Sequence, residues 1–251
     1  MAGRRLGQHF LARRSVLERI AAAACPFPDK PVLEIGAGKG ALTEYLLRLA
    51  PHVEAVELDQ VLVHYLQEKF REHPGFTVRH SDVLKTDLSQ WGPVQVAGNL
   101  PYYITSPILE KVLALGSDLL HAVFLVQKEV ADRVVAKPGS RDYGYLSVQV
   151  QVFAEANYLF TVPPDAFKPP PKVDSAVIEL RPYRQPLTAD PKGLVQFASH
   201  CFRQKRKMLR NNLAGIFPIE AIDAQPEARL RAEQLSVVQL ADLRDRILKF
   251  P

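Results

Sequence analysis

The sequence predicts an α/β fold with a mostly parallel sheet, an antiparallel hairpin at one sheet edge and a small all-helical C-terminal domain. Short strand-like runs alternate with helical patterns up to about residue 130, which is typical of parallel strands joined by crossover helices. A proline-rich turn, KPPPK at 168–172, separates two further strand-like segments. Beyond residue 185 the pattern is helical. We therefore expect domains at 1–184 and 185–251.

The individual elements follow from apolar spacing. Parallel strands are expected within residues 32–38, 52–59, 76–84, 94–103 and 121–130, and helices at 41–50, 61–73 and 106–115. The segments 157–167 and 173–182 are expected to form the edge hairpin. Residues 146–154, LSVQVQVFA, alternate like a strand but occupy the place of a helix in an α/β chain, and periodicity leaves both possibilities open. The C-terminal helical runs are 193–217, 226–235 and 236–248.

Composition sets broad limits on function. The chain has 251 residues and a net charge of +5, from 32 basic and 27 acidic residues, which is compatible with a polyanionic partner. Its two cysteines, Cys25 and Cys201, have no Cys or His neighbours at metal-ligand spacing. We therefore expect no disulfide and no metal, and a cytoplasmic location. The apolar run near the N-terminus is too short for a signal peptide or a membrane span.

A possible nucleoside site follows the first strand. EIGAGKG places Gly36, Gly38 and Gly40 at a strand-to-helix turn, where bare backbone can approach a ligand. Glu57 and Asp82 end the next two strands and could accept hydrogen bonds from ribose hydroxyls and from an adenine amino group. The glycines could equally form only a tight turn, the carboxylates could be helix caps, and a nicotinamide dinucleotide would use similar groups.

The stretch NLPY after the fourth strand points to chemistry on an amine. The Asn99 amide oxygen and a backbone carbonyl of the Leu100-Pro101 step could accept both hydrogens of an adenine N6 and direct its lone pair at an electrophile. Tyr102 could stack on the base. The simpler interpretation is a proline turn with an interior aromatic residue.

With these motifs, the chain resembles the small-subunit (16S) ribosomal RNA adenine N6,N6-dimethyltransferases nearly from end to end. The motifs that carry the resemblance are GQHFL (7–11), EIGAGKG, VELD, SDVL, GNLPY, LVQKEVADR, YGYLSV, VPPDAFKPPPKVDSAVIEL and FRQKRKMLRNNL. The family implies a Rossmann-like, class I methyltransferase sheet. It also implies S-adenosyl-L-methionine as the methyl donor, with S-adenosyl-L-homocysteine as product and no metal.

The resemblance also implies roles for individual residues. Cofactor contacts are implied for His9, Leu11, Gly36, Glu57, Asp82 and Asn99, with Gly38 in the same glycine turn. Many relatives have Asn where this chain has His9. Catalytic roles fall on Asn99, Leu100, Pro101 and Tyr102, and Phe167 is the implied second aromatic wall of a base held against Tyr102. From the residues alone, Phe167 could instead be an ordinary core side chain.

The resemblance further implies the reaction and its substrate. Attack of N6 on the sulfonium methyl would be an in-line displacement without a covalent enzyme intermediate. The substrate would be an unpaired or extruded adenosine, one of two neighbouring adenosines in a loop near the 3′ end of small-subunit RNA. We expect a monomer that acts on a pre-assembled ribosomal particle during ribosome biogenesis.

Two basic regions are candidate RNA contacts. Five residues, Arg203, Lys205, Arg206, Lys207 and Arg210, fall on one expected helical stretch and would cover more than half of its circumference. A solvated helix face is the alternative interpretation. A second basic edge is expected from Arg4, Arg5, Arg13 and Arg14. Such contacts would position RNA through its phosphates without reading its sequence.

Three other functions remain open at this point. The large-subunit ribosomal RNA adenine methyltransferases of macrolide resistance share the same catalytic motifs, although PPPKVDSAVIEL and FRQKRK favour the small-subunit branch. A mitochondrial transcription-factor relative would bind nucleic acid without depending on catalysis. A nicotinamide-dependent dehydrogenase would bind its dinucleotide at the glycine turn and would not bind S-adenosylmethionine.

Overall fold

The computed structural model describes residues 9–250. The chain forms two compact units, the first comprising residues up to Ala131 together with Ala156–Pro182. The second comprises Asp132–Glu155 and the chain from Tyr183 onward. These packing units differ from the expected domains 1–184 and 185–251, because residues 132–155 pack with the C-terminal helices. The assignment of separate functions to the two parts remains a prediction.

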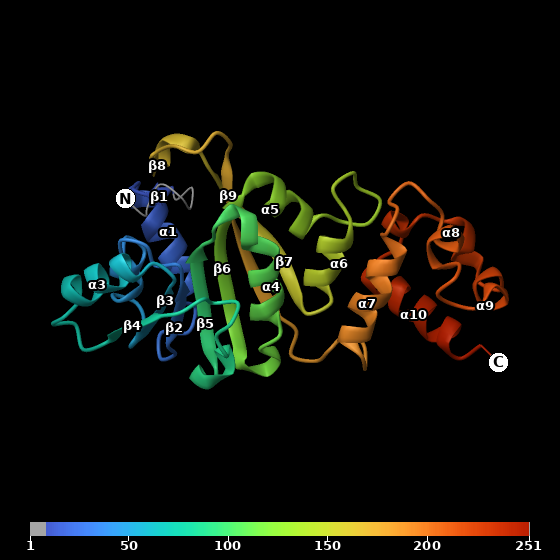
Figure 1. Cartoon of the computed structure of the whole chain (residues 1–251), viewed down its shortest axis with the longest axis horizontal. Coiled ribbons are helices and arrows are strands. Elements are labelled where there is room, and N and C mark those ends of the chain that lie inside the picture. Colours follow the sequence, from blue (N-terminus) through green and yellow to red (C-terminus); the bar gives the residue numbers. More distant parts are fainter. Residues whose placement is uncertain (1–8, 251) are drawn as a thin grey trace. The chain divides into compact units, whose positions relative to one another are not determined.

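The first unit is built on a seven-stranded sheet with the order β4-β3-β2-β5-β6-β9-β7 (Figure 1). Its strands are β2 (Val32–Ile35), β3 (Val53–Glu57), β4 (Phe76–His80), β5 (Val94–Asn99), β6 (Leu119–Gln127), β7 (Ala154–Val162) and β9 (Ser175–Pro182). The five strands from β4 to β6 are parallel, and β9 runs antiparallel to β6. The predicted parallel sheet with a reversed edge is confirmed.

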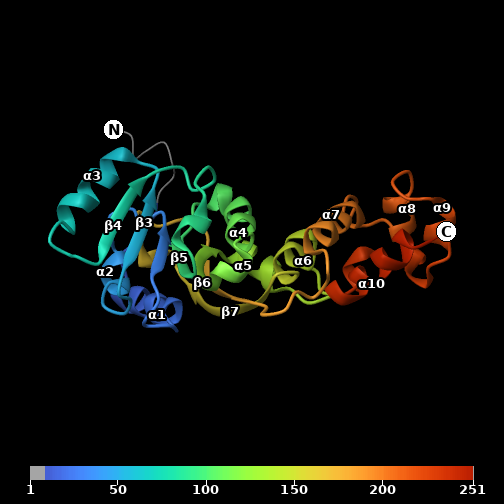
Figure 2. The same cartoon turned by 90° about the horizontal axis from the view of Figure 1, so that it is seen from below.

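Helices cover both faces of this sheet. They are α1 (Arg14–Ala24), α2 (Thr43–Leu46), α3 (Gln60–Lys69), α4 (Thr105–Leu113) and the start of α5 (Lys128–Val135). Figure 2 shows α1 and α4 on opposite sides of the strands. The short 3-10 helices are η2 (Leu88–Trp91), η3 (Tyr102–Ile104), η4 (Gly116–Asp118) and η5 (Pro164–Ala166). The helix expected at 41–50 is wrong in extent, because turns occupy most of that range.

A two-stranded sheet, which the sequence patterns did not predict, joins distant parts of the first unit. Strand β1 (Phe10–Leu11) pairs antiparallel with β8 (Phe167–Lys168), and Leu11 lies opposite Phe167. The Ala12 N–H donates to the Ala166 carbonyl at 2.8 Å, which continues the pairing. This small sheet brings the start of the described chain to the carboxyl ends of the main strands.

The ambiguous segment 146–154 is mainly helical. Helix α6 (Tyr145–Gln151) begins after Gly144, and β7 begins only at Ala154. The Ser147 hydroxyl accepts the Gly144 N–H at 3.0 Å and itself donates to the Arg133 carbonyl, so it fixes the first turn of the helix. Four successive residues of this short helix, 147–150, are buried, which is why their apolar spacing does not distinguish a helix from a strand.

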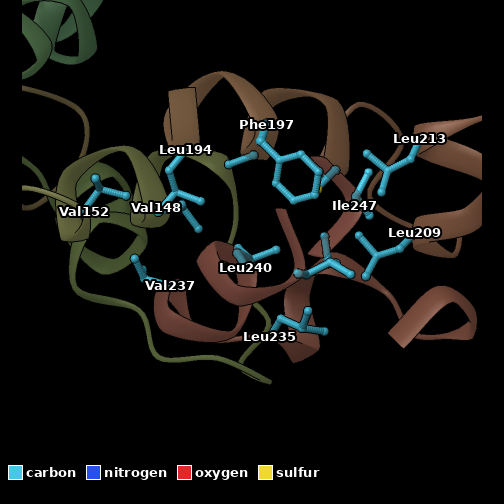
Figure 3. Packing of buried hydrophobic residues seen from close by; sticks show 14 of the residues in the cluster. Val148, Val152, Leu194, Phe197, Leu209, Leu213, Leu235, Val237, Leu240 and Ile247 are labelled. Atoms are coloured by element: carbon cyan, nitrogen blue, oxygen red, sulfur yellow. The ribbon is translucent and has the colours of Figure 1, made fainter. Parts of the chain in front are cut away.

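The second unit is a helical assembly around its own apolar core. Its elements are the end of α5, α6, α7 (Pro191–Cys201), α8 (Leu209–Leu213), α9 (Ile219–Asp223), α10 (Val237–Leu248) and the 3-10 helices η6 (Pro226–Arg229) and η7 (Ala232–Gln234). Figure 3 shows Val148 and Val152 of the α6 region in one cluster with Leu194, Phe197 and Leu240. This shared core explains why residues 132–155 belong to the C-terminal unit.

Two expected helices are interrupted in this unit. The run 193–217 divides into α7 and α8, with turns at 202–206 between them. The run 226–235 contains only the short 3-10 helices η6 and η7. In residues 9–250, no helix combines the length and apolar character that crossing a membrane requires.

Candidate functional site

A cavity of about 290 Å³ lies at the carboxyl ends of β2, β3, β4 and β5. Most of the predicted site residues line it, namely His9, Leu11, Gly36, Gly38, Glu57, Asp82, Asn99, Leu100, Pro101 and Tyr102. The parallel register explains this convergence, because Ile35 pairs with Val56 and Glu57 with His80. Four strands therefore end side by side, where ligands of open parallel sheets bind.

The glycine turn contributes two positions without side chains, Gly36 and Gly38, to the cavity lining. Gly36 and Gly38 have φ angles of +72° and +58°, in the left-handed region that favours glycine. A Cβ atom at Gly38 would lie 3.2 Å from the Phe10 ring. The Gly38 N–H donates to Glu57 Oε2 at 2.9 Å, so the carboxylate of the neighbouring strand holds the turn in place.

Both predicted carboxylates are partly engaged by backbone. Glu57 is 4% exposed, and its Oε1 accepts the N–H groups of Leu58 and Asp59 at 2.9 and 3.0 Å. Asp82 Oδ1 accepts the Leu84 N–H at 2.9 Å. The segment after Asp82 is a turn, so this contact closes a local turn. Glu57 Oε2 and Asp82 Oδ2 retain capacity to accept hydrogen bonds from a ligand.

The Asn99 side chain is oriented by the main chain of His9. Asn99 Nδ2 donates to the His9 carbonyl oxygen at 3.1 Å. The amide nitrogen of Asn99 is therefore engaged by the protein. Its Oδ1, a hydrogen-bond acceptor, is left for another partner. The backbone after Asn99 is held as well, because the Leu100 N–H donates to the Leu125 carbonyl at 3.0 Å.

Two of the aromatic rings that line the cavity, those of His9 and Tyr102, lie near each other. The ring centroids of His9 and Tyr102 are 6.2 Å apart, and their planes differ by 28°. The Tyr102 hydroxyl forms a hydrogen bond with Ser175 Oγ at 2.8 Å. Burial raises the pKa of the Tyr102 phenol, while the Ser175 contact acts in the opposite direction. The Tyr102 phenol is therefore neutral, and its hydroxyl group anchors the ring to Ser175.

Glu34 is a cavity residue that the sequence reasoning missed. It is 2% exposed in the middle of β2, and the Thr43 hydroxyl donates to its Oε2. Burial, reinforced by the nearby Glu57 charge, raises the pKa of the Glu34 carboxyl to about 7. The sequence signal that could have identified Glu34 is an acidic residue inside an otherwise apolar strand, VLEI.

The structure does not bring Phe167 to the cavity. Phe167 is 2% exposed and packs in the apolar core with Leu11 and Leu17. It is absent from the cavity lining, although Leu11, its partner in the small sheet, lines the cavity. Its predicted role as second aromatic wall therefore has no support from this geometry, and the core interpretation fits it.

The predicted basic helix is a turn in the second unit. Arg203, Lys205, Arg206 and Lys207 are exposed in the segment between α7 and α8, and Arg210 alone lies in a helix. The buried Asn212 side chain explains the interruption, since its Nδ2 donates to the carbonyls of Cys201 and Gln204 at 2.7 and 3.2 Å. Its Oδ1 accepts the Gln204 N–H at 3.1 Å. One amide thus replaces the helical hydrogen bonds of the turn.

The basic side chains differ in their availability. Arg210 donates two hydrogen bonds to the Asp223 carboxylate, and Lys205 Nζ donates to the Arg141 carbonyl at 2.6 Å. Among the residues from 9 to 250, no hydrogen bond or ion pair engages the side chains of Arg203, Arg206 or Lys207. Of the five basic residues, these three are therefore the most available for contacts with phosphate groups.

The predicted N-terminal basic edge is only partly visible. Arg4 and Arg5 lie outside the described residues. Arg13 forms an ion pair with Asp165 at 2.7 Å, and Arg14 forms one with Glu18 at 2.8 Å. Both arginines are therefore already neutralised by neighbouring carboxylates in the first unit.

Comparison with known proteins gives consistent matches. Residues 2–247 match the family model described as ribosomal RNA adenine dimethylase. A ribosomal RNA small subunit methyltransferase A from Hydrogenovibrio crunogenus is 40% identical over 244 residues, covering 93% of this chain and 92% of the relative.

Two solved structures extend the likeness to the fold. A dimethyladenosine transferase from Plasmodium falciparum aligns with a TM-score of 0.83 at 25% identity, covering 96% of this chain and 97% of the other. The 23S rRNA methyltransferase ErmE aligns with a TM-score of 0.74 at 31% identity, covering 94% of this chain and 99% of the other. Both structural likenesses extend over nearly the whole chain, second unit included.

Proposed function

Because the chain belongs to the ribosomal RNA adenine dimethylase family, we propose that it transfers methyl groups from S-adenosylmethionine to adenosine N6 in small-subunit ribosomal RNA. The product is N6,N6-dimethyladenosine. The observation that carries the proposal is the Asn99 amide, which is oriented by the His9 carbonyl at the carboxyl end of β5. The small-subunit substrate follows the name of the 40% identical relative.

The hydrogen-bond acceptors at the cavity suit S-adenosylmethionine. Gly36 and Gly38 leave their backbone open to a ligand, and Glu57 and Asp82 offer carboxylate oxygens at the ends of adjacent strands. Those oxygens suit ribose hydroxyls and an adenine amino group, respectively. When bound, S-adenosylmethionine supplies an electrophilic methyl group on its sulfonium.

Asn99 and the following backbone would bind the amine to be methylated. With Nδ2 held by His9, Asn99 Oδ1 accepts one N6 hydrogen of the adenine. The Pro101 carbonyl already accepts the Ile104 N–H and the Thr105 hydroxyl, at 3.1 and 3.2 Å. The Leu100 carbonyl is thus the better second acceptor. Two accepted hydrogens favour a pyramidal N6 with its lone pair free, which is the reactive form.

Tyr102 would supply the face on which the adenine stacks. Its ring stands at the cavity, and its hydroxyl is anchored on Ser175. An adenine must leave any helical stack to reach this position. The proposed target is therefore an unpaired adenosine, one of two neighbours in a loop near the 3′ end of small-subunit RNA within a pre-assembled particle.

The proposal is tested by following labelled methyl groups from S-adenosylmethionine. The full chain is incubated with small-subunit particles that lack the modification, with protein-free small-subunit RNA and with large-subunit RNA, and the products are identified as nucleosides. Dimethyladenosine from small-subunit particles alone supports the proposal. Label in large-subunit RNA would favour the second candidate, a methyltransferase of the ErmE type, which the structural likeness to that enzyme motivates.

The variant Asn99→Ala separates an enzyme from a nucleic-acid-binding relative. We expect it to lower methyl transfer about 100-fold or more, because a preorganised acceptor is lost. The matched control is Asn211→Ala, which removes an exposed amide outside the cavity lining. Unchanged RNA-dependent function in Asn99→Ala would contradict the catalytic proposal.

A further inference from the structure

The loop between α5 and α6, KPGSRD at 137–142, is an exposed part of the second unit with a defined conformation. Its first four residues form a turn, in which the Ser140 N–H donates to the Lys137 carbonyl at 3.1 Å and Gly139 has a φ angle of +81°. Pro138 and Gly139 are the residue types that such a turn favours at its two central positions. The Ser140 hydroxyl also donates to the Lys137 carbonyl, at 2.7 Å. The local sequence therefore fixes the course of the loop.

Both ends of this loop are anchored in the apolar core of the second unit. Ala136 and Tyr143, the residues on either side of it, are buried in that core. The Tyr143 ring packs edge-on against the ring of Phe202, with centroids 6.0 Å apart. Phe202 is the first residue of the turn between α7 and α8. The loop 137–142 and the basic turn 202–207 are therefore held on the same part of the core.

Lys205 links the loop to the basic turn directly. Its Nζ donates to the Arg141 carbonyl at 2.6 Å and lies 3.8 Å from the Glu233 carboxylate. The Gly139 N–H donates to the Glu233 carbonyl at 2.7 Å, so Glu233 contacts both the loop and Lys205. The Lys205 charge is thus already used within the protein, which distinguishes it from the basic residues on either side of it.

The loop adds unpaired charges to those of the turn. Lys137 and Arg141 are exposed, and within the described part of the chain no hydrogen bond or ion pair engages either side chain. The acidic residues beside them are Asp142 and Glu233, and Glu233 is paired with Lys205. The free basic side chains of the two segments are Lys137, Arg141, Arg203, Arg206 and Lys207.

We propose that the loop 137–142 and the turn 202–207 form one phosphate-binding surface for small-subunit RNA, with Lys205 as the positioning residue that holds the two segments together. This inference rests on the proposed function, because it assigns a contact surface to the proposed RNA substrate. Basic groups that the protein has not neutralised release counterions when they bind RNA phosphates. Segments that are fixed before binding also lose less conformational entropy, so their contacts contribute more to affinity.

The test uses the full chain with Lys137→Ala, Arg141→Ala, Lys205→Met and the double variant of Arg141→Ala with Lys205→Met. The matched control is Lys249→Ala, because Lys249 is an exposed basic residue of the same unit outside both segments. Filter binding to protein-free small-subunit RNA over a range of salt gives the Kd and the slope of log Kd against log salt concentration. Thermal unfolding of each variant verifies that it is folded.

We expect Lys137→Ala and Arg141→Ala each to weaken RNA binding about fivefold and to reduce the slope by about 1. Lys205→Met should weaken binding by a similar factor, because the loop loses its bond to the turn. If Lys205 acts through Arg141, the double variant should bind within about twofold of Arg141→Ala alone. The control Lys249→Ala should bind within about twofold of wild type.

Two results with protein-free RNA would overturn the inference. An unchanged slope in both Lys137→Ala and Arg141→Ala would mean that the loop does not contact RNA phosphates. Fully additive losses in the double variant would mean that Lys205 contacts RNA itself and does not act by positioning the loop.

Parallel measurements on small-subunit particles separate this inference from the proposed function. Losses of affinity seen with particles but not with protein-free RNA would mean that a protein of the particle contacts the loop, and this would overturn the inference. Wild-type protein that forms no dimethyladenosine in the particles would overturn the proposed function, whereas the salt slopes test the surface independently of methyl transfer.

Discussion

At the scale of single residues, the site depends on polar groups that the backbone has already engaged. Glu57 accepts three backbone N–H groups, and Asn99 donates to one carbonyl. These contacts fix where the remaining acceptors lie before any ligand binds. Such preorganisation is what allows a side-chain oxygen to favour one geometry of a reacting amine.

The Glu34 carboxyl should make stability depend on pH. Its usual pKa of 4.5 is raised to about 7 in the folded chain, so between these values the native state holds a proton that the unfolded state has released. The free energy of unfolding should therefore fall as pH rises from 4.5 to about 7. Above that window the loss amounts to about 3 kcal/mol.

Glu34→Gln tests this dependence because glutamine keeps the shape and cannot ionise. Relative to wild type, the variant should gain unfolding free energy as pH rises from about 5 to about 8, measured by urea denaturation. Parallel pH profiles for the two proteins would show that Glu34 does not titrate in this range.

Phe167 and Tyr102 should respond differently to the same substitution. Phe167→Leu keeps an apolar side chain in the core and should lower the free energy of unfolding by about 1 kcal/mol, with a small effect on methyl transfer. Tyr102→Leu removes a stacking face and should lower kcat/KM about tenfold or more. Equal losses of kcat/KM in both variants would contradict this prediction and would indicate that Phe167 contacts the target base.

At the scale of elements, the turn between α7 and α8 depends on Asn212. This side chain is 4% exposed and satisfies backbone groups of Cys201 and Gln204. Asn212→Leu would remove these partners, including that of the buried Cys201 carbonyl, and should lower the free energy of unfolding by about 1 to 3 kcal/mol. The control Asn211→Leu changes an exposed neighbour in the same helix and should cost less than about 1 kcal/mol. Equal costs in chemical denaturation would contradict the role of Asn212.

How far the sequence predicted each element depends on the range of the interactions that form it. The parallel strands and the glycine turn rest on local patterns, and those predictions are confirmed. The structure also places Glu57, Asp82 and Asn99 at one cavity, and their roles there stay predictions. The pairing of β1 with β8 joins two-residue strands more than 150 residues apart, for which no local pattern exists. The burial of Phe167 and the close approach of the His9 and Tyr102 rings also depend on contacts between segments far apart in the sequence. Local patterns therefore do not predict them.

The prediction of a helix for the basic turn was wrong for a different, local reason. Residues 202–207 carry good helix formers, yet Asn212, from the following helix, provides hydrogen bonds that stabilise a turn. Intrinsic preference is a weak guide where a buried side chain from another element competes. The change matters for function, because a turn presents Arg203, Arg206 and Lys207 together as exposed groups.

At the scale of the whole molecule, a net charge of +5 is modest, so affinity for RNA should depend on where free charges lie. Each phosphate contact releases counterions and steepens the fall of affinity with salt. Arg206 and Lys207 have free charged ends among the described residues, whereas Arg210 is held by Asp223. Ion pairs formed within the protein before binding should contribute little to the salt dependence.

Lys207→Ala should therefore weaken binding to small-subunit particles and reduce the slope of log Kd against log salt concentration by about 1. Arg210→Ala is the matched comparison on the same segment, and it should change the slope by much less, since it removes a charge already neutralised by Asp223. Both slopes are measured by filter binding over a range of salt with the full chain. An unchanged slope in Lys207→Ala, or a larger change in Arg210→Ala, would mean that this turn is a solvated surface and that RNA is held elsewhere on the protein.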